Sequence, residues 1–336
     1  MPPFRGGRPR AGHDHGAGVL TVEAPLVHPG SLVGLAGLPA GAIERLLDRA
    51  EAWLAAWERG SLAPVLFGRS VALWFAEPST RTRVSFEQAA SLLGARAIVI
   101  GERGTSLEKG ETLADTAATL QATGVDAVVV RHAASGVPEQ LAHAVRIPVL
   151  NAGDGTHEHP TQGLLDALTV RCAFGRVAGL RVAIVGDVLH SRVARSTTWA
   201  LAALGAHVVL CGPPTLVPAA LAQALPAEVE QDLHRALQGA DVVMALRLQK
   251  ERMAAAYLPS EEEYRALWGI TAERLQWARP HALFLHPGPS NRGVEVESDV
   301  HDGPRSLVRQ QVRHGVAVRM AVLERALGEG AAAWPS

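Results

Sequence analysis

The sequence has few of the residue types on which several classes of site depend. Its 336 residues include only two cysteines, Cys172 and Cys211, too few for a disulfide framework or a thiolate zinc site. Two histidines near the N-terminus, His13 and His15, have no further metal ligands nearby and are expected to lie in a solvated tail. We therefore expect a protein of the reducing cytoplasm that uses neither a metal nor another cofactor.

Lysine is as scarce as cysteine. Lys109 and Lys250 are the only two, so arginine supplies 30 of the 32 basic residues. The formal net charge of −1 leaves no overall positive field of the kind that attracts nucleic acid. No apolar run approaches the roughly 18 residues of a membrane span, and the N-terminal stretch lacks the apolar centre of a secretory signal. We expect neither nucleic acid nor a membrane as a partner, so any anion site must be built locally.

Short β-branched runs alternate with helical patterns along most of the chain. The runs lie at residues 71–76, 97–101, 126–131, 181–187, 207–212, 241–247 and 282–287. Apolar residues at helical spacing occupy 86–93, 113–120, 165–172 and 197–204, and Gly94, Gly124, Gly175 and Gly205 follow as helix stops. This alternation predicts an α/β fold with two similar-sized domains, each a mostly parallel sheet flanked by helices.

The seam between the two domains is expected near residues 171–180, between a helix and the second series of strands. Residues 1–30 are expected to form a disordered N-terminal extension. The two domains then cover 31–170 and 171–305, and 306–336 form a C-terminal helix and tail that packs back on one of them.

Polar residues are concentrated at the junction between the first predicted strand and the helix that follows it. The segment "EPSTRTR" places Ser79 at the N-cap, and Thr80, Arg81 and Thr82 in the first turn. Free backbone N–H groups, the positive end of the helix dipole, three hydroxyls and a guanidinium together favour an anion such as phosphate. The alternative is a well-capped helix with surface arginines.

Other predicted strands end in the same kind of residue. Arg131 ends one strand, Arg192 begins the helix after "GDVLHS", and Arg247 and Gln249 end another strand. In open α/β sheets ligands bind at the carboxyl ends of the strands, so these arginines and Arg81 are expected to share one crevice, without obvious acidic partners. Such a crevice suits small polyanions.

The segment "HEHPTQGLLD" adds uncharged polar groups to the same edge. Pro160 suits the first turn of a helix, which sets His159 at the helix start and Gln162 one turn further on. The helix dipole opposes protonation of His159, so a neutral imidazole could donate to a carbonyl oxygen; the alternative is a capping histidine. Paired carboxylates for acid/base work, a Ser/His/Asp elbow, a metal cluster and a G-x-G-x-x-G loop are all missing. The pattern indicates polar stabilisation without a covalent intermediate.

With these segments in view, the sequence resembles the catalytic chain of the aspartate carbamoyltransferases over roughly residues 31–328. The family's order is followed by "STRTR" (79–83), "TSLEKGET" (105–112), "HPTQGLLD" (159–166), "GDVLHSRVARS" (186–196), "RLQKER" (247–252) and "HPGP" (286–289). The last two segments favour aspartate as the acceptor, because ornithine enzymes carry a D-x-W-x-S-M-G loop and a cysteine after the last strand.

The resemblance implies transfer of a carbamoyl group from carbamoyl phosphate to L-aspartate, in pyrimidine biosynthesis, with 31–170 binding carbamoyl phosphate and 171–305 binding aspartate. It implies the catalytic residues His159, Arg81, Thr82 and Arg131. Carbamoyl phosphate would be held by Ser79, Thr80, Arg81, Thr82, Arg131, His159, Gln162, Pro287 and Gly288, and aspartate by Lys109, Arg192, Arg247 and Gln249.

The family also forms trimers with shared sites, so Ser106 and Lys109 are expected to come from the neighbouring chain. Some members with an N-terminal tail assemble with dihydroorotase or a pseudo-dihydroorotase, which stays open as a partner here. Two alternatives also stay open: a carbamoyltransferase with another acceptor such as ornithine, and a catalytically silent scaffold.

Overall fold

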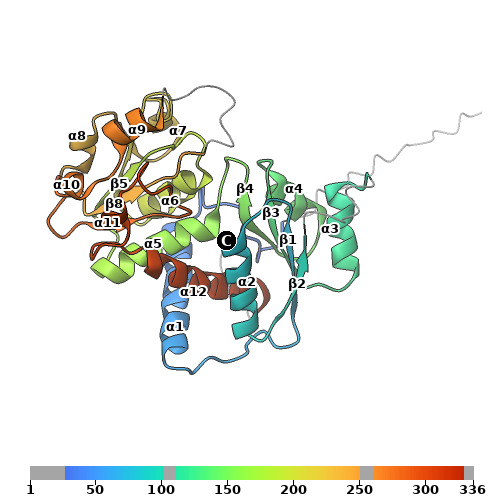
Figure 1. The fold of residues 1–336 in the computed structure, drawn as a ribbon. Coiled ribbons are helices and arrows are strands. Elements are labelled where there is room, and N and C mark those ends of the chain that lie inside the picture. The colour runs from blue at the N-terminus through green and yellow to red at the C-terminus, as the bar shows by residue number, and fades with distance from the viewer. Residues whose placement is uncertain (1–26, 102–109, 250–259, 329–336) are drawn as a thin grey trace, which may run out of the picture.

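The computed structural model describes residues 27–101, 110–249 and 260–328, and it contains two parallel sheets (Figure 1). The first sheet has the strand order β2-β1-β3-β4, and every neighbouring pair is parallel. Its strands are β1 (Ser70–Phe75), β2 (Arg96–Ile100), β3 (Ala127–His132) and β4 (Val149–Asp154). Strands β1 and β4 are buried along their whole length, as expected for a sheet that is covered on both faces.

The second sheet has the order β7-β6-β5-β8-β9 and is also parallel throughout. Its strands are β5 (Arg181–Val185), β6 (His207–Cys211), β7 (Glu228–Glu230), β8 (Val242–Ala245) and β9 (Leu283–Leu285). In each sheet the chain first adds strands on one side and then continues on the other, so the strand order switches between β1 and β3 in the first sheet and between β5 and β8 in the second. Ligand sites of open α/β sheets form at the carboxyl edge near such points.

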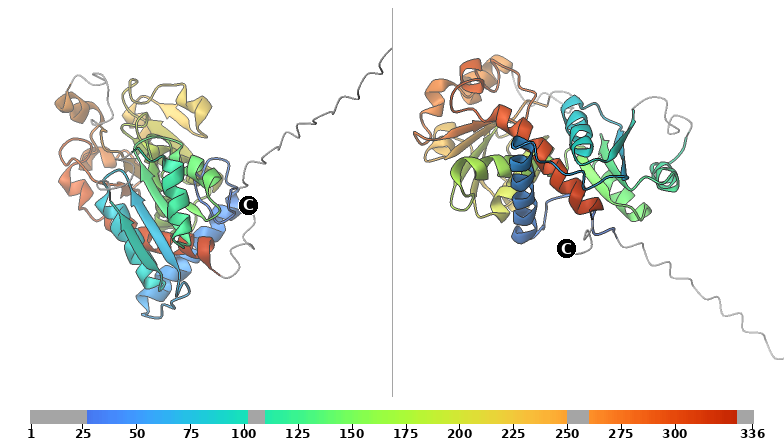
Figure 2. Two further views of the ribbon diagram at one scale, coloured as in Figure 1. Left: turned by 90° about the vertical axis from the view of Figure 1, so that its right-hand side faces the viewer. Right: turned by 90° about the horizontal axis from the view of Figure 1, so that it is seen from below.

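Twelve helices are described in these ranges. They are α1 (Ala40–Glu58), α2 (Thr80–Leu92), α3 (Leu113–Ala122), α4 (Val137–Ala144), α5 (Pro160–Phe174), α6 (Arg192–Ala203), α7 (Leu221–Ala224), α8 (Leu233–Leu237), α9 (Glu261–Trp268), α10 (Ala272–Leu275), α11 (Ser298–His301) and α12 (Val308–Leu327). The long helices α1, α5 and α12 pack together at the junction of the two sheets (Figures 1 and 2).

Two helices make the connection between the sheets especially close. Helix α5 packs against α6, and Gly163 is the contact point, since an added Cβ would lie 2.6 Å from the carbonyl oxygen of Ser196. Helix α12 returns from the second sheet to pack on α1, α2 and α5. The expected C-terminal helix that packs back is therefore confirmed, and it brings residues from the end of the chain beside α2.

The predicted α/β fold with two parallel sheets is confirmed. All seven predicted strand segments overlap strands of the structure, and the four helical patterns fall in α2, α3, α5 and α6. The four glycines expected as helix stops all have positive φ, between 70 and 85°. Strands β4 and β7 were not predicted. None of the described helices is long and apolar enough to span a membrane.

Candidate active site

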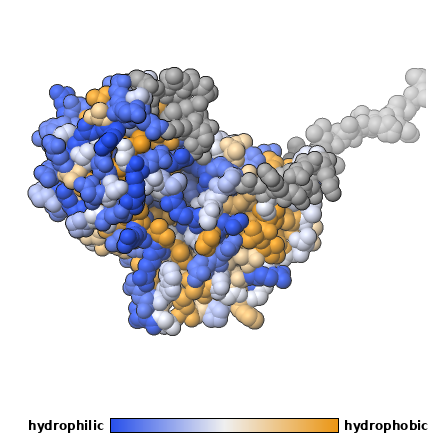
Figure 3. Space-filling model, viewed as in Figure 1, coloured by the Kyte–Doolittle hydropathy of each residue, from blue (hydrophilic) through white to orange (hydrophobic). Residues whose placement is uncertain are grey.

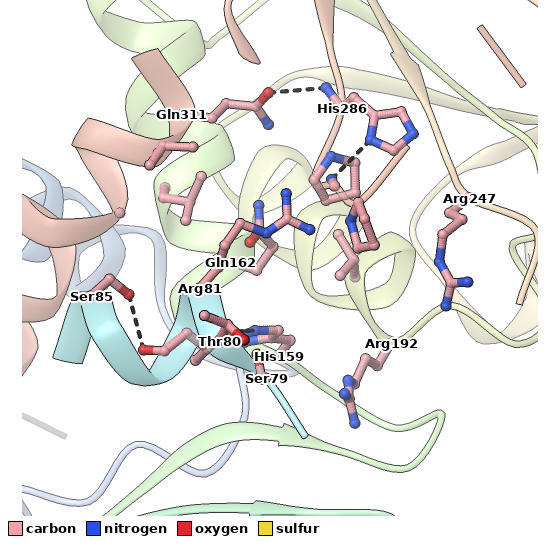
Figure 4. A pocket seen from close by; sticks show the side chains of 18 of the residues that line it. Ser79, Thr80, Arg81, Ser85, His159, Gln162, Arg192, Arg247, His286 and Gln311 are labelled. Atoms are coloured by element: carbon pink, nitrogen blue, oxygen red, sulfur yellow. Dashed lines mark hydrogen bonds between the residues drawn. The ribbon is translucent and has the colours of Figure 1, made fainter. Parts of the chain in front are cut away.

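A cavity of about 560 Å³ lies where the carboxyl edges of both sheets meet α12. The predicted site residues Ser79, Thr80, Arg81, Thr82, Arg131, His159, Gln162, Arg192, Arg247, Gln249, Pro287 and Gly288 all line it. Figure 3 shows hydrophilic residues around the hollow between the two halves, and Figure 4 shows the labelled side chains converging on it. Ser106 and Lys109 lie outside the described residues, as do Lys250, His13 and His15.

The start of α2 forms one wall of the cavity. Ser79 is the N-cap residue in extended conformation, and its side chain makes no capping hydrogen bond, so the first turn keeps its N–H groups toward the cavity. Thr82 is buried, and its Oγ1 lies 3.5 Å from Nε2 of His159. His159 is itself the N-cap residue of α5, and its backbone N–H donates to Oγ of Ser196. Two helix N-termini thus face one space.

Arg81 crosses the cavity from α2 to the loop after β9. At Gly288, where φ is +63°, an added Cβ would lie 1.8 Å from Nη1 of Arg81, so this contact requires glycine. The side chain faces the cavity, but partial removal from water and, as the smaller cause, the like charge of Arg247 lower the pKa of Arg81. A guanidinium in this position is stabilised when an anion binds beside it.

Glu77 corrects the expectation that the arginines lack acidic partners. Its Oε1 accepts from Nη2 of Arg131 at 2.6 Å and from Nη2 of Arg192 at 2.5 Å, and its Oε2 accepts from Nη1 of Arg192 at 3.1 Å. Gly153 leaves room for this cluster, because an added Cβ would lie 2.9 Å from Nε of Arg192. Glu77 stands two residues before the predicted Ser79 and joins Arg131 of β3 to Arg192 at the start of α6.

Arg247 and Gln249 come from the segment after β8 and form the far wall. Nη2 of Arg247 donates to Oε1 of Gln249 at 3.3 Å, and both side chains are half-buried. The backbone N–H of Gln249 donates to Oδ2 of the buried Asp187 at 3.1 Å. The amide of Gln249 therefore helps to hold the arginine toward the cavity.

Arg83, two residues after Arg81 on α2, lies outside the cavity. Its exposed side chain pairs with Glu87 one turn further along α2, with 3.4 Å between Nε and Oε1. The backbone turns Arg81 and Arg83 to different sides of the helix, so only the first reaches the cavity.

Sequence reasoning missed the contribution of α12 to the cavity. Arg319 is only 3% exposed, donates to the carbonyl oxygen of Gly315 at 2.8 Å and stacks over Phe86 with 5.1 Å to the ring centroid. Burial, and then the charge of Arg131, lower the pKa of Arg319 to about 9. Gln311 also lines the cavity from α12.

A buried carboxylate lies directly behind this wall. Asp166 is fully buried and accepts from Nε2 of Gln162 at 2.9 Å, from Nε2 of Gln311 at 2.7 Å and from Oγ1 of Thr197 at 2.7 Å. Burial raises the pKa of Asp166 from 3.8 to about 6, although its three hydrogen bonds oppose this rise. Ionisation of Asp166 therefore costs free energy in the folded chain.

We expect the wild-type chain to lose stability relative to an Asp166→Asn variant as the pH rises from about 5 to about 8. The folded chain holds the Asp166 proton more tightly than the unfolded chain, so deprotonation over this range lowers the free energy of unfolding. The difference in free energy of unfolding between the two proteins should change by about 1.4 kcal/mol over this range. This is the value of one pH unit, because pH 5 lies about one unit below the pKa of about 6 in the folded chain. Urea denaturation at one chain concentration measures it, and a difference that stays constant with pH would contradict the expectation.

The fold and the cavity together define a class of protein. Two α/β domains with parallel sheets place two helix N-termini and five arginines around one cavity. This arrangement suits an enzyme that binds small polyanions and stabilises the negative charge that develops as they react. Comparison with known families is more specific. Residues 31–172 match the carbamoyl-P binding domain of aspartate/ornithine carbamoyltransferases, and residues 178–326 match their Asp/Orn binding domain. The chain belongs to the aspartate/ornithine carbamoyltransferase family.

Individual relatives agree with this assignment. An aspartate carbamoyltransferase catalytic subunit of Gluconobacter oxydans is 55% identical over 304 residues, which cover 90% of this chain and 97% of the relative. One from Salinispora tropica is 54% identical over 300 residues, covering 88% and 97%. Among solved structures, the aspartate transcarbamoylase of Trypanosoma cruzi in complex with N-(phosphonacetyl)-L-aspartic acid has a TM-score of 0.82 at 32% identity, covering 90% and 97%. An ornithine carbamoyltransferase of Pyrococcus furiosus has a TM-score of 0.80 at 31% identity, covering 90% and 98%.

Proposed function

We propose that this cavity transfers the carbamoyl group of carbamoyl phosphate to the amino group of L-aspartate, which gives N-carbamoyl-L-aspartate and phosphate. The observation that carries the proposal is the convergence on one cavity of the α2 N-terminus, Arg131 of the first sheet, and Arg192 and Arg247, which follow strands of the second. Both substrates are anions, and the cavity supplies the cations and N–H groups that two anions require. The curated relatives at 54 and 55% identity are named for the same activity.

In this proposal the phosphate binds at the start of α2, where Ser79, Thr80, Arg81 and Thr82 line the cavity. Thr82, Arg131 and His159 then surround the carbonyl oxygen of the carbamoyl group, and the 3.5 Å contact between Thr82 and His159 fits two donors that share one acceptor. Gln162 and the carbonyl groups around Pro287 and Gly288 would accept from the carbamoyl NH2. Arg192, Arg247 and Gln249, together with Lys109 of a neighbouring chain, would hold aspartate.

The reaction needs no covalent intermediate. The aspartate amine attacks the carbamoyl carbon, a tetrahedral oxyanion forms, and the C–O bond to phosphate breaks as phosphate takes up the amine proton. Holding the two substrates in attack geometry can lower the barrier by about 7–11 kcal/mol. One oxyanion donor can contribute about 3–4 kcal/mol. The catalytic groups named here are therefore donors and cations rather than a nucleophile.

Arg247 favours aspartate over ornithine as the acceptor, because a cationic side chain of the acceptor would face another cation. We expect the purified chain to form N-carbamoyl-L-aspartate from carbamoyl phosphate and L-aspartate, with at least a hundredfold lower rate on L-ornithine. In Arg247→Ala the KM for aspartate should rise by about tenfold or more, as for loss of a charge-assisted hydrogen bond. A chain that forms citrulline faster, or neither product, would contradict the proposal, and the second outcome would favour a silent scaffold.

We also propose that the chain acts in the cytoplasm as a homotrimer with shared sites, in which Ser106 and Lys109 of one chain complete the site of the next. The first sheet supports an interface between chains. Its edge strand β2 is only partly covered, and Val99 on it is 45% exposed. Figure 3 shows an apolar area over this part of the molecule. Exposed apolar area at a sheet edge is typical of a surface that another chain covers.

The proposed function also assigns one substrate to each of the two domains. We assign carbamoyl phosphate to residues 31–170 and aspartate to 171–305, with 1–30 as an extension and 306–336 as the closing helix and tail. The family matches at 31–172 and 178–326 support this division. A further assembly with a dihydroorotase or pseudo-dihydroorotase would be detected by copurification of the full chain with such a protein.

A further inference from the structure

The wall of the cavity that faces the proposed carbamoyl NH2 is backed by a chain of hydrogen bonds. The backbone N–H of His286 donates to Oε1 of Gln311 at 3.0 Å (Figure 4), and Nε2 of Gln311 donates to Oδ1 of Asp166 at 2.7 Å. Nε2 of Gln162 donates to the same carboxylate oxygen at 2.9 Å. This network of hydrogen bonds joins the loop after β9 to helices α12 and α5, and the residues that form it are at most 8% exposed.

This chain of bonds has a fixed polarity. A glutamine amide can usually be turned end for end, but a backbone N–H can only donate, so it requires Oε1 of Gln311 on its side. The amide nitrogen of Gln311 must then face Asp166, and an ionised carboxylate can only accept. Asp166 therefore also requires the nitrogen end of Gln162, which directs Oε1 of Gln162 away from it, on the cavity side.

The same network of hydrogen bonds also positions the carbonyl groups around Pro287 and Gly288, the other acceptors proposed for the carbamoyl NH2. Nδ1 of His286 accepts from the backbone N–H of Gly288 at 2.8 Å, so His286 fixes the turn that carries Pro287 and Gly288. Both partners proposed for the carbamoyl NH2, the Gln162 oxygen and this turn, are thus set by one buried network. A network that presents only acceptors matches an NH2 group and leaves a methyl group without partners.

We propose that Asp166 and Gln311 are positioning residues that make the cavity select a carbamoyl group over an acetyl group, by holding the Gln162 carbonyl oxygen toward the substrate NH2. Neither residue needs to touch the reacting atoms. Asp166 lies behind Gln162 with no exposed surface. The inference rests on the proposed function, since it takes Gln162 to be the partner of the carbamoyl NH2.

The test compares two ligands that share the phosphate and differ only in NH2 against CH3, carbamoyl phosphate and acetyl phosphate. Their dissociation constants are measured by calorimetry on the wild-type chain and on Asp166→Leu and Asp166→Ala. Both variants remove the acceptor, and leucine also fills the space, so at least one is expected to melt cooperatively. We expect the preference for carbamoyl phosphate to fall about tenfold in both, as for loss of one hydrogen bond, while acetyl phosphate binds as in the wild type.

Two further variants sharpen the test. Thr197→Val removes a different hydrogen bond of the same carboxylate and leaves the contact with Gln162, so the preference should not change. In Asp166→Asn the amide oxygen can still accept from both glutamines while its nitrogen faces Thr197, so most of the preference should return. An unchanged preference in Asp166→Leu and Asp166→Ala would overturn the inference, and so would an equal loss of affinity for both ligands.

Failure of the proposed function gives a different result. Gln162→Ala should itself lower the preference about tenfold, because it removes the Gln162 acceptor and leaves the turn at Pro287 and Gly288. If the wild-type chain does not prefer carbamoyl phosphate, or if Gln162→Ala keeps the preference, then the role assigned to Gln162 is wrong and the inference falls with it. If Gln162→Ala loses the preference and the Asp166 variants keep it, only the positioning role is wrong.

Discussion

Replacing Arg81 with alanine is expected to lower kcat by about a thousandfold. Arg81 projects from the first turn of α2 to the loop at Gly288, across the place proposed for the leaving phosphate. Negative charge moves onto the phosphate as the C–O bond breaks, so the guanidinium stabilises the transition state more than the bound substrate. The loss of one such donor costs about 3–4 kcal/mol in other enzymes. Steady-state kinetics with carbamoyl phosphate as the varied substrate measure it.

The same helix offers a matched control. Arg83 is exposed, lies outside the cavity and pairs with Glu87, and exposed pairs of this kind contribute at most about 1 kcal/mol to stability. Arg83→Ala should therefore change kcat less than about twofold, although it removes the same charge two residues away. Similar rates for the two variants would mean that Arg81 acts through the general charge of α2 and not through a contact with phosphate.

The residues at strand ends could be predicted because their place depends on local rules. Ser79 to Thr82 follow β1 and His159 precedes the first turn of α5, and the parallel arrangement of the strands brings such ends together. What these rules do not contain is how each side chain is paired. Glu77 follows β1 of the first sheet and Arg192 begins α6 after β5 of the second, and their bond exists only because the two domains meet.

Strand β4 escaped prediction for a related reason. Its sequence "VLNAGD" has two apolar residues followed by polar and small ones, so it lacks the β-branched run that marks the other central strands. The structure buries Asn151 and Asp154 because they bond each other, with 2.7 Å between Nδ2 and Oδ1, and tertiary partners replace water. Gln311 and Arg319 were missed likewise, since periodicity predicts α12 but not which sheet edge it crosses.

Mixing two inactive variants is expected to restore about a quarter of the wild-type activity. In a shared site, His159 comes from one chain and Lys109 from its neighbour, so Lys109→Ala and His159→Ala should each be nearly inactive alone. In trimers formed at random from equal amounts of both, about one site in four contains both native residues. A flexible lysine stem with a compact ammonium suits a reach across an interface toward an anion.

A second pair of variants separates sharing from other causes of recovery. His159 and Arg81 line one cavity within a single chain, so each site takes both residues from the same chain. Mixing His159→Ala with Arg81→Ala should therefore give no recovery, although the chains exchange just as well. Exchange is verified by native mass spectrometry of chains that differ in isotope content. If verified hybrids of Lys109→Ala and His159→Ala stay inactive, Lys109 acts within its own chain, because only sharing places both native residues in one site.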